Sequence, residues 1–226
     1  MNLLPAASWN EIAGWLFADA GTLGEIRARY KETEEIRSRI IAVPAQPNML
    51  SHITGPLHAA WVDYVMGNYL GTIALCGMIG EMLAMLIHEL IVRKGENRAS
   101  FVDDFARCRQ AKRLKVLSGR CRPRQGRKFG LNGAQSLLAN GVYEALDGIH
   151  RTRIVYYHSY SKSLSNVRRD AKNIYSKTVA AVNEVIGLDV HQARLRLKPR
   201  VFPYLMWCMR SDLANVFRRY EQFQRY

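Results

Sequence analysis

The stretch LGTIALCGMIGEMLAMLIHELIV, residues 70–92, is the most apolar part of the chain and decides which class of fold is possible. It is long enough to cross a lipid bilayer. Three ionisable residues lie within it: Glu81, His88 and Glu89. Each of them would be costly in lipid, and the three glycines of the stretch are small enough to let neighbouring helices pack closely. We therefore expect a helix buried in the core of a soluble protein, with no membrane contact.

Helical patterns fill most of the chain on both sides of this stretch. Ser8 with Glu11, and Thr22 with Glu25, have the capping-box spacing of a helix start. Pro44 interrupts the pattern, and SGRCRPRQGRKFG, residues 118–130, is predicted to be a loop. The predicted helices cover about 8–19, 22–41, 56–94 with a bend or an interruption near its glycines, 100–117, 133–150, 163–186 and 202–226. The sequence thus predicts an all-α protein.

Two segments conflict with this helical pattern. RTRIVYYHSY, residues 151–160, is rich in β-branched and aromatic residues, and RLRLK, residues 194–198, alternates as a strand does. We predict a helix for the first segment because its context is helical, and we leave the second open between helix and strand.

Composition indicates one basic globular protein. The 226 residues contain 33 Lys and Arg against 19 Asp and Glu, a formal net charge of +14, and 48% are hydrophobic. The four cysteines, Cys76, Cys108, Cys121 and Cys208, are scattered, with no spacing typical of a zinc site. The first residues do not resemble a signal peptide. We expect a cytoplasmic protein with reduced thiols and neither a bound metal nor a cofactor.

The positive charge is concentrated in one interval. No acidic residue occurs between Asp104 and Glu144. The interval holds ten cations, the first being Arg107 and the others Arg109, Lys112, Arg113, Lys115, Arg120, Arg122, Arg124, Arg127 and Lys128. A solvated face is the ordinary explanation of a charge run, but ten cations without an acid favour contact with a phosphate backbone. We expect the nine residues from Arg109 onward to bind nucleic acid, RNA or DNA.

A second candidate site lies in RTRIVYYH, residues 151–158. Cleavage of RNA without a metal needs a base for the ribose 2'-OH, a cation for the charged phosphorane and an acid for the leaving oxygen, and His and Arg can supply these. On a helix Arg151 lies about 20° from His158, whereas Arg153 lies about 140° away. Helix geometry alone therefore favours Arg151 as the partner of His158.

The same segment resembles the Arg-x4-6-His motif of the HEPN superfamily (higher eukaryotes and prokaryotes nucleotide-binding). IVYYHSY is followed by a helix with RRDAKNIY, and WVDYVMGNYLGTIALCGMIGEMLAMLI is similar to the preceding helix of that superfamily, which leads to a glutamate, here Glu81. The resemblance covers about residues 60–186. It implies an antiparallel four-helix bundle over 55–187 within a single domain, with helical extensions over 1–54 and 188–226.

The resemblance also implies roles for individual residues. His158 matches the motif histidine, and either Arg153 or Arg151 matches its arginine. The superfamily usually has a polar residue directly after that arginine; Thr152 fits this pattern and Ile154 does not, so the arginine is left open. Glu81 is a candidate for orienting it across the bundle. Thr152 and Tyr157 are further candidates for orienting the site, and Tyr157 and Tyr156 are candidates for base stacking.

Three functions are compatible with these features. The resemblance implies a homodimeric, metal-independent endoribonuclease, often a toxin or antiviral defence effector, with an antitoxin or other regulatory partner. Some members of the superfamily bind nucleic acid without cutting it, which gives the second function. The third is a helical interaction protein whose cations meet an acidic protein.

Overall fold

The structure is a computed structural model that describes residues 23–38, 47–92, 97–131, 138, 140–158, 166–186, 188–191 and 194–197. Over these residues the chain is almost entirely helical, and the predicted all-α class is confirmed. The elements are α2 (Leu23–Ser38), α3 (Pro47–Met66), α4 (Tyr69–Ile91), α5 (Arg98–Ala106), α6 (Gln110–Leu117), α7 (Pro123–Lys128), α8 (Asn140–His158), α9 (Val167–Ile186), β1 (Leu188–His191) and β2 (Arg194–Leu197). The helices predicted over 8–19 and 202–226 lie outside the described residues.

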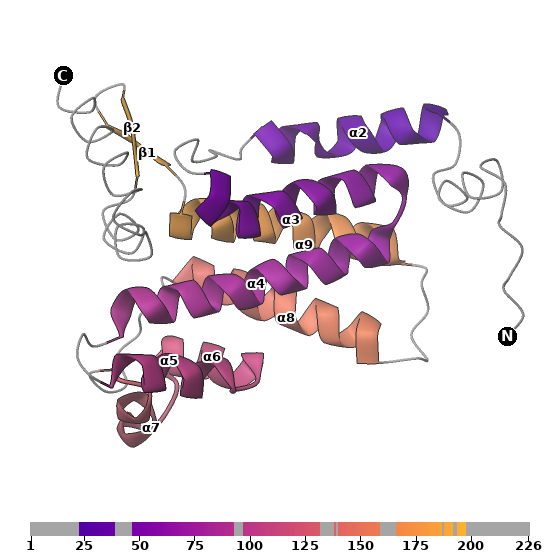
Figure 1. The fold of residues 1–226 in the computed structure, drawn as a ribbon. Helices are drawn as coiled ribbons and strands as arrows, with labels where there is room; N and C mark the ends of the chain where they lie inside the picture. Colours follow the sequence, from indigo (N-terminus) through magenta and orange to yellow (C-terminus); the bar gives the residue numbers. More distant parts are fainter. Residues whose placement is uncertain are drawn as a thin grey trace, which may run out of the picture.

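Four long helices form the body of the fold. Figure 1 shows α3, α4, α8 and α9 side by side, each running opposite to the one before it in the chain. Helix α4 packs against each of the other three, and α8 also packs against α9. Helix α2 covers α3 and α9, while α5, α6 and α7 lie at the far side of α4 (Figure 1).

Helix α4 is the centre of the core, as expected for the apolar stretch. Ile73, Cys76, Ile79 and Leu83 are fully buried along it. Among the described residues, α4 is the one helix whose length and composition would also suit a membrane span, over Tyr69–Glu89, and 56% of the apolar window in that span is buried inside the fold. Protein side chains thus surround most of the helix.

The helical pattern over 56–94 is interrupted, which is one of the two outcomes predicted near its glycines, because the chain turns between α3 and α4. Gly67 adopts a φ of 91°, which a residue with a Cβ rarely adopts. The side chain of Asn68 then caps α4 by accepting a hydrogen bond from the backbone N of Gly71 at 2.9 Å. Helix α3 starts earlier than predicted, at Pro47, so it continues through the predicted boundary at 54/55.

The basic interval is also more structured than predicted. The expected helix over 100–117 is interrupted at 107–109, and the expected loop over 118–130 contains α7. Pro123 stands in the first turn of α7, where its missing N–H needs no partner. His88 of α4 holds this region in place: its ring stacks on Phe105 at 3.9 Å, and its Nε2 donates to the carbonyl oxygen of Phe129 at 2.9 Å.

The C-terminal extension is not helical where it is described. Residues 188–191 and 194–197 pair as an antiparallel hairpin, with Leu188 opposite Leu197. The predicted helical extension over 188–226 is therefore wrong for 188–191 and 194–197. The alternating RLRLK segment, which was open between helix and strand, forms β2 up to Leu197. Strand propensity decided the outcome there.

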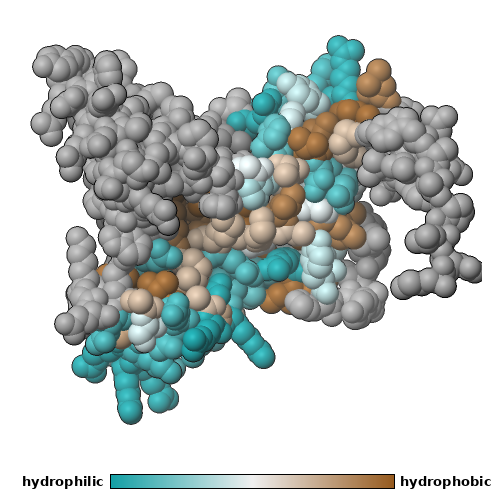
Figure 2. Space-filling view, viewed as in Figure 1, coloured by the Kyte–Doolittle hydropathy of each residue, from teal (hydrophilic) through white to brown (hydrophobic). Residues whose placement is uncertain are grey.

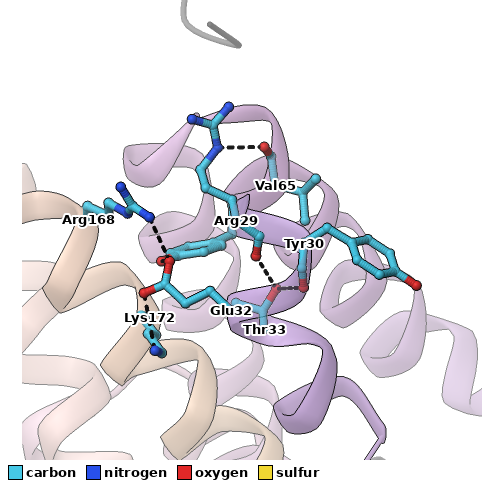
Figure 3. A network of polar contacts seen from close by, with 8 residues as sticks. Arg29, Tyr30, Glu32, Thr33, Val65, Arg168 and Lys172 are labelled. Atoms are coloured by element: carbon cyan, nitrogen blue, oxygen red, sulfur yellow. Dashed lines mark hydrogen bonds and ion pairs between the residues drawn. The ribbon is translucent and has the colours of Figure 1, made fainter. Parts of the chain in front are cut away.

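Helix α2 is joined to α3 and α9 by the network in Figure 3. Glu32 accepts hydrogen bonds from Tyr64 at 2.9 Å and Arg168 at 2.8 Å, and pairs with Lys172 at 3.1 Å. Arg29 is buried and donates from Nε to the carbonyl oxygen of Val65 at 2.7 Å. The face of α2 that contacts the bundle is therefore largely polar, although it also contains the buried Ile36.

The same network controls the charge of Glu32. Burial disfavours the ionised carboxylate, but the hydrogen bonds from Arg168, Lys172 and Tyr64 outweigh it, so the pKa of Glu32 is lowered. The pKa of the Tyr64 hydroxyl is raised well above its ordinary value, chiefly by burial. Glu32 thus stays ionised and Tyr64 stays a donor at neutral pH.

Candidate active site

An ion pair between Glu81 of α4 and Arg153 of α8 is the centre of the candidate site. Arg153 Nη1 donates to Glu81 Oε1 across the two packed helices. The side chains are 37% and 38% exposed, so a bound molecule can reach both. Of the two candidate arginines, Arg153 is the one that contacts Glu81 in the structure, and an orienting role for Glu81 stays a prediction.

A glycine gives Arg153 the space to reach Glu81. A Cβ at Gly77 would stand 2.3 Å from Cδ of Arg153, closer than real atoms approach. One turn further along α4, a Cβ at Gly80 would stand 3.0 Å from Ile149. Helices α4 and α8 therefore approach closely along Gly77 and Gly80, and the arginine crosses α4 at the first of these glycines.

Two other residues of α8 lie on the same face as Arg153. Tyr157, one turn later, donates from its hydroxyl to the backbone oxygen of Leu70 at 2.9 Å, at the start of α4. His150, one turn earlier, is partly buried and interacts electrostatically with Glu81 and Arg153. The face of α8 toward α4 therefore carries His150, Arg153 and Tyr157, each about one helical turn from the next.

Arg151 lies in a different environment. Its side chain is 75% exposed and pairs with Asp147 of the same helix at 2.8 Å. Thr152 donates its hydroxyl to the backbone oxygen of Gly148 at 2.9 Å, so it is engaged within α8. The structure does not bring Arg151 or Thr152 to Glu81.

His158 is the last residue of α8. Its backbone lies five residues beyond Arg153, which is about 7.5 Å along a helix axis. Its side chain is outside the described part of the structure. The structure thus places the histidine at the end of the helix that carries the arginine.

Tyr156 has a structural contact. Its hydroxyl donates to Asp170 of α9 at 2.7 Å, and burial together with this carboxylate raises the pKa of Tyr156 to about 12. Tyr156 therefore joins α8 to α9, whereas Tyr157 is 44% exposed beside the site. Of the two tyrosines considered for base stacking, only Tyr157 has an exposed ring.

The basic segment forms an exposed surface over α6 and α7. Figure 2 shows hydrophilic residues gathered over this part of the molecule. Its exposed members are Arg109, Lys112, Lys115, Arg120, Arg122, Arg124, Arg127 and Lys128. Among the described residues none of them pairs with a carboxylate, although Arg120 lies 4.2 Å over the ring of Tyr143. We call these eight residues the basic surface.

Arg113 differs from its neighbours. It is partly buried and donates to the backbone oxygens of Phe105, at 3.2 Å, and of Ala106. These carbonyls belong to the last turn of α5, where helical partners are missing. The guanidinium of Arg113 therefore caps α5, and its contact with nucleic acid stays a prediction.

A glutamine connects the basic surface to the ion pair. Gln110, the first residue of α6, donates from Nε2 to the backbone oxygen of Gly80 at 3.1 Å. Gly80 directly precedes Glu81. Helix α6 and its cations therefore begin beside the turn of α4 that carries the glutamate.

The described residues offer no cluster of metal ligands, and the one fully buried thiol among them packs in the core. No three His, Cys, Asp or Glu side chains gather there as metal ligands. Cys76, Cys108 and Cys121 are free thiols, and burial raises the pKa of Cys76 to about 12. Cys76 is therefore a packing residue, and Cys208 lies outside the described part.

Sequence reasoning missed two residues of this site. His150 was not among the predicted site residues, although its spacing of three from Arg153 is the spacing of neighbours on a helix face. Gln110 gave no signal, because its bond to Gly80 joins residues 30 apart in the chain.

Comparisons of the chain with protein-family models, curated proteins and solved structures found no match. The functional assignment therefore depends on the residues and geometry described above.

Proposed function

We propose that the protein is a metal-independent endoribonuclease of the HEPN type. The observation that supports this most directly is the ion pair between Glu81 of α4 and Arg153 of α8. Helix α8 is also the helix that ends in His158. Such a pair holds a guanidinium at a fixed place without making it inaccessible. The basic surface begins beside it, which suits a substrate with a phosphate backbone.

The proposed reaction uses the 2'-OH of RNA as the nucleophile. His158 takes the proton of that hydroxyl, and its oxygen attacks the adjacent phosphorus. Arg153 stabilises the negative charge of the phosphorane, and Glu81 orients Arg153. The bond from phosphorus to the 5'-oxygen then breaks, and a protonated acid, His158 of a second subunit, supplies the proton that this oxygen gains. The products are a 2',3'-cyclic phosphate and a 5'-hydroxyl.

Exposed apolar residues beside the site suit a second copy of the chain. Leu70 and Met78 of α4 and Ile154 and Tyr157 of α8 are each about 40% exposed. Leu70 and Tyr157 are in contact, because the Tyr157 hydroxyl donates to the backbone oxygen of Leu70. A homodimer formed over this face would bring two Arg153 and His158 sets together. A cytoplasmic toxin or defence effector controlled by an antitoxin is the biological setting that this proposal implies.

Cleavage of RNA by the purified protein tests the proposal. In EDTA the wild-type protein should cut RNA, leave DNA intact and produce 2',3'-cyclic phosphate ends. The variant His158→Ala should lose about a hundredfold or more of the rate. His58→Ala is the matched control, since His58 is an exposed residue of α3 away from α8. Full activity of His158→Ala would refute this mechanism.

The choice between the two arginines is tested in the same assay. Arg153→Ala should reduce the rate as strongly as His158→Ala, since it removes the partner of Glu81. Arg151→Ala should change it only a few-fold, because Arg151 contacts only Asp147 among the described residues. The reverse ranking would assign the motif to Arg151 and His158.

A nucleic-acid-binding protein without catalysis is the second candidate. Ile154 after Arg153 departs from the polar residue that is usual in the superfamily, and this observation favours loss of catalysis. Salt-dependent binding of RNA or DNA without cleavage would support this candidate. Absence of any nucleic-acid binding would instead favour an acidic protein as the partner of the basic surface.

A further inference from the structure

We infer that His150 is a positioning residue for the Glu81–Arg153 ion pair: as a neutral imidazole it leaves the carboxylate to Arg153, and as a cation it competes with Arg153 for that carboxylate. Its effect on the structure is independent of the proposed function, whereas its effect on RNA cleavage rests on that function. No role for His150 follows from the Arg-x4-6-His motif.

The backbone places His150 next to the pair. It precedes Arg153 by three residues, so the two side chains are neighbours on one face of α8. The adjacent Ile149 packs on Gly80, the residue before Glu81. His150 therefore lies opposite the same turn of α4 as the glutamate, on the side of Arg153 away from Tyr157.

The charges around His150 are balanced. Asp147 and Glu81 favour a proton on the imidazole, while Arg153 and Arg151 disfavour it. The charges of these two acids and two cations add to zero, so a proton on His150 gives the group a net positive charge.

Burial decides which form is present at neutral pH. It is the largest influence on His150 and lowers its pKa below the ordinary value, although Asp147 and Glu81 oppose this effect. The imidazole is therefore neutral at pH 7, and the carboxylate of Glu81 is left to Arg153. Acidification below the ordinary range of histidine adds the proton, and the cation then competes for Glu81.

The proton affinity of His150 measures this coupling without any assay of activity. We would follow its imidazole Cε1–H signal by NMR between pH 4 and 8 in the full-length protein. Glu81→Gln should lower its proton affinity at least about twofold, the effect of one unit charge within about 10 Å in water. Arg153→Gln should raise it by a similar factor. Asp103→Asn, on exposed α5, is the control and should leave it unchanged.

A second measurement follows the arginine itself. The Nε–H signal of Arg153 should shift as His150 titrates, and His150→Gln should abolish that shift while the fold is kept. His150→Lys introduces a permanent cation, so at pH 7 it should give the Arg153 signal that wild type shows at acidic pH. An Arg153 signal independent of pH, or an unchanged His150 titration in Glu81→Gln, would overturn the inference.

The cleavage assay separates this inference from the proposed function. If the protein cuts RNA, the rate of wild type should change with pH across the titration of His150, and His150→Gln should lose that part of the profile. Coupling in the NMR data with no RNA cleavage supports the inference and refutes the ribonuclease. Cleavage with identical pH profiles in both proteins supports the ribonuclease and overturns the role of His150 in it.

Discussion

Gly77→Ala tests whether the close approach of α4 and α8 holds the site together. Alanine in a helix interior is favoured over glycine by about 0.5–1 kcal/mol. Against this, the new methyl would stand 2.3 Å from Cδ of Arg153 and force the side chain to move. Overpacking of this kind costs about 1–3 kcal/mol, and the lost, partly exposed ion pair adds up to about 1 kcal/mol. We expect Gly77→Ala to be net destabilising.

A double-mutant cycle isolates this contact. In an Arg153→Ala background the clash is absent, so Gly77→Ala should stabilise the protein by about 0.5–1 kcal/mol. The coupling between the two changes should therefore exceed about 1 kcal/mol in urea unfolding followed by circular dichroism. Gly141→Ala is the control: it lies in α8, nothing is within 4 Å of its new methyl, and its effect should be equal in both backgrounds. Equal effects of Gly77→Ala in both backgrounds would refute the geometry.

Three other predictions concern the polar network, the basic surface and the dimer. Glu32→Gln should lower the free energy of unfolding by about 1–2 kcal/mol at pH 7. The pKa of Glu32 is lowered in the folded state, so its ionised carboxylate stabilises the fold above the ordinary pKa of 4.5. This stabilisation is lost as the pH falls below that value. In urea titrations from pH 6 to 3, the variant should therefore lose less stability than wild type. Gln at the four arginines of residues 120–127 should weaken RNA binding and reduce the slope of log affinity against log salt by up to about 3, whereas Gln at exposed Arg27 and Lys31 of α2 should leave both unchanged in filter binding. Sedimentation should give about twice 25.8 kDa, and Ile154→Glu should halve this mass; a wild-type monomer would contradict the dimer.

Sequence patterns predicted the helices well where one face is apolar over several turns. The segment 151–158 shows a second kind of success. Its β-branched residues favour a strand, its context predicted a helix, and the structure has a helix. Its contacts with α4 and α9, through Tyr157 and Tyr156, outweigh that local preference. Local signals failed at the helix ends. The turn at Gly67 depends on one positive φ, and the glycines of the long helical pattern predicted a bend or an interruption without indicating at which of them it falls.

The candidate site was predictable in part. The motif histidine and the two arginines lie in one short segment, so the sequence alone identifies them. Their environments depend on distant residues that pack around that segment. Arg153 rather than Arg151 meets Glu81 because of which face of α8 packs on α4, and that depends on residues 72 apart in the chain. The cap that Arg113 forms on α5 has the same origin, because the turn at 107–109 folds α6 back beside α5. A charge run in a sequence does not reveal which of its members is used internally.

The network around Glu32 has a consequence for how the chain is made. Part of the contact surface of α2 lies on α3, which follows it closely, but Arg168 is 136 residues further along the chain. At about 5–20 residues per second, a ribosome needs about 7–27 s to add those residues. For most of this interval Glu32 has Tyr64 within reach but neither of its cations, so α2 can pack on α3 but not yet on α9. The docking of α2 is therefore completed only when α9 emerges, and it is one of the last steps in the maturation of the bundle.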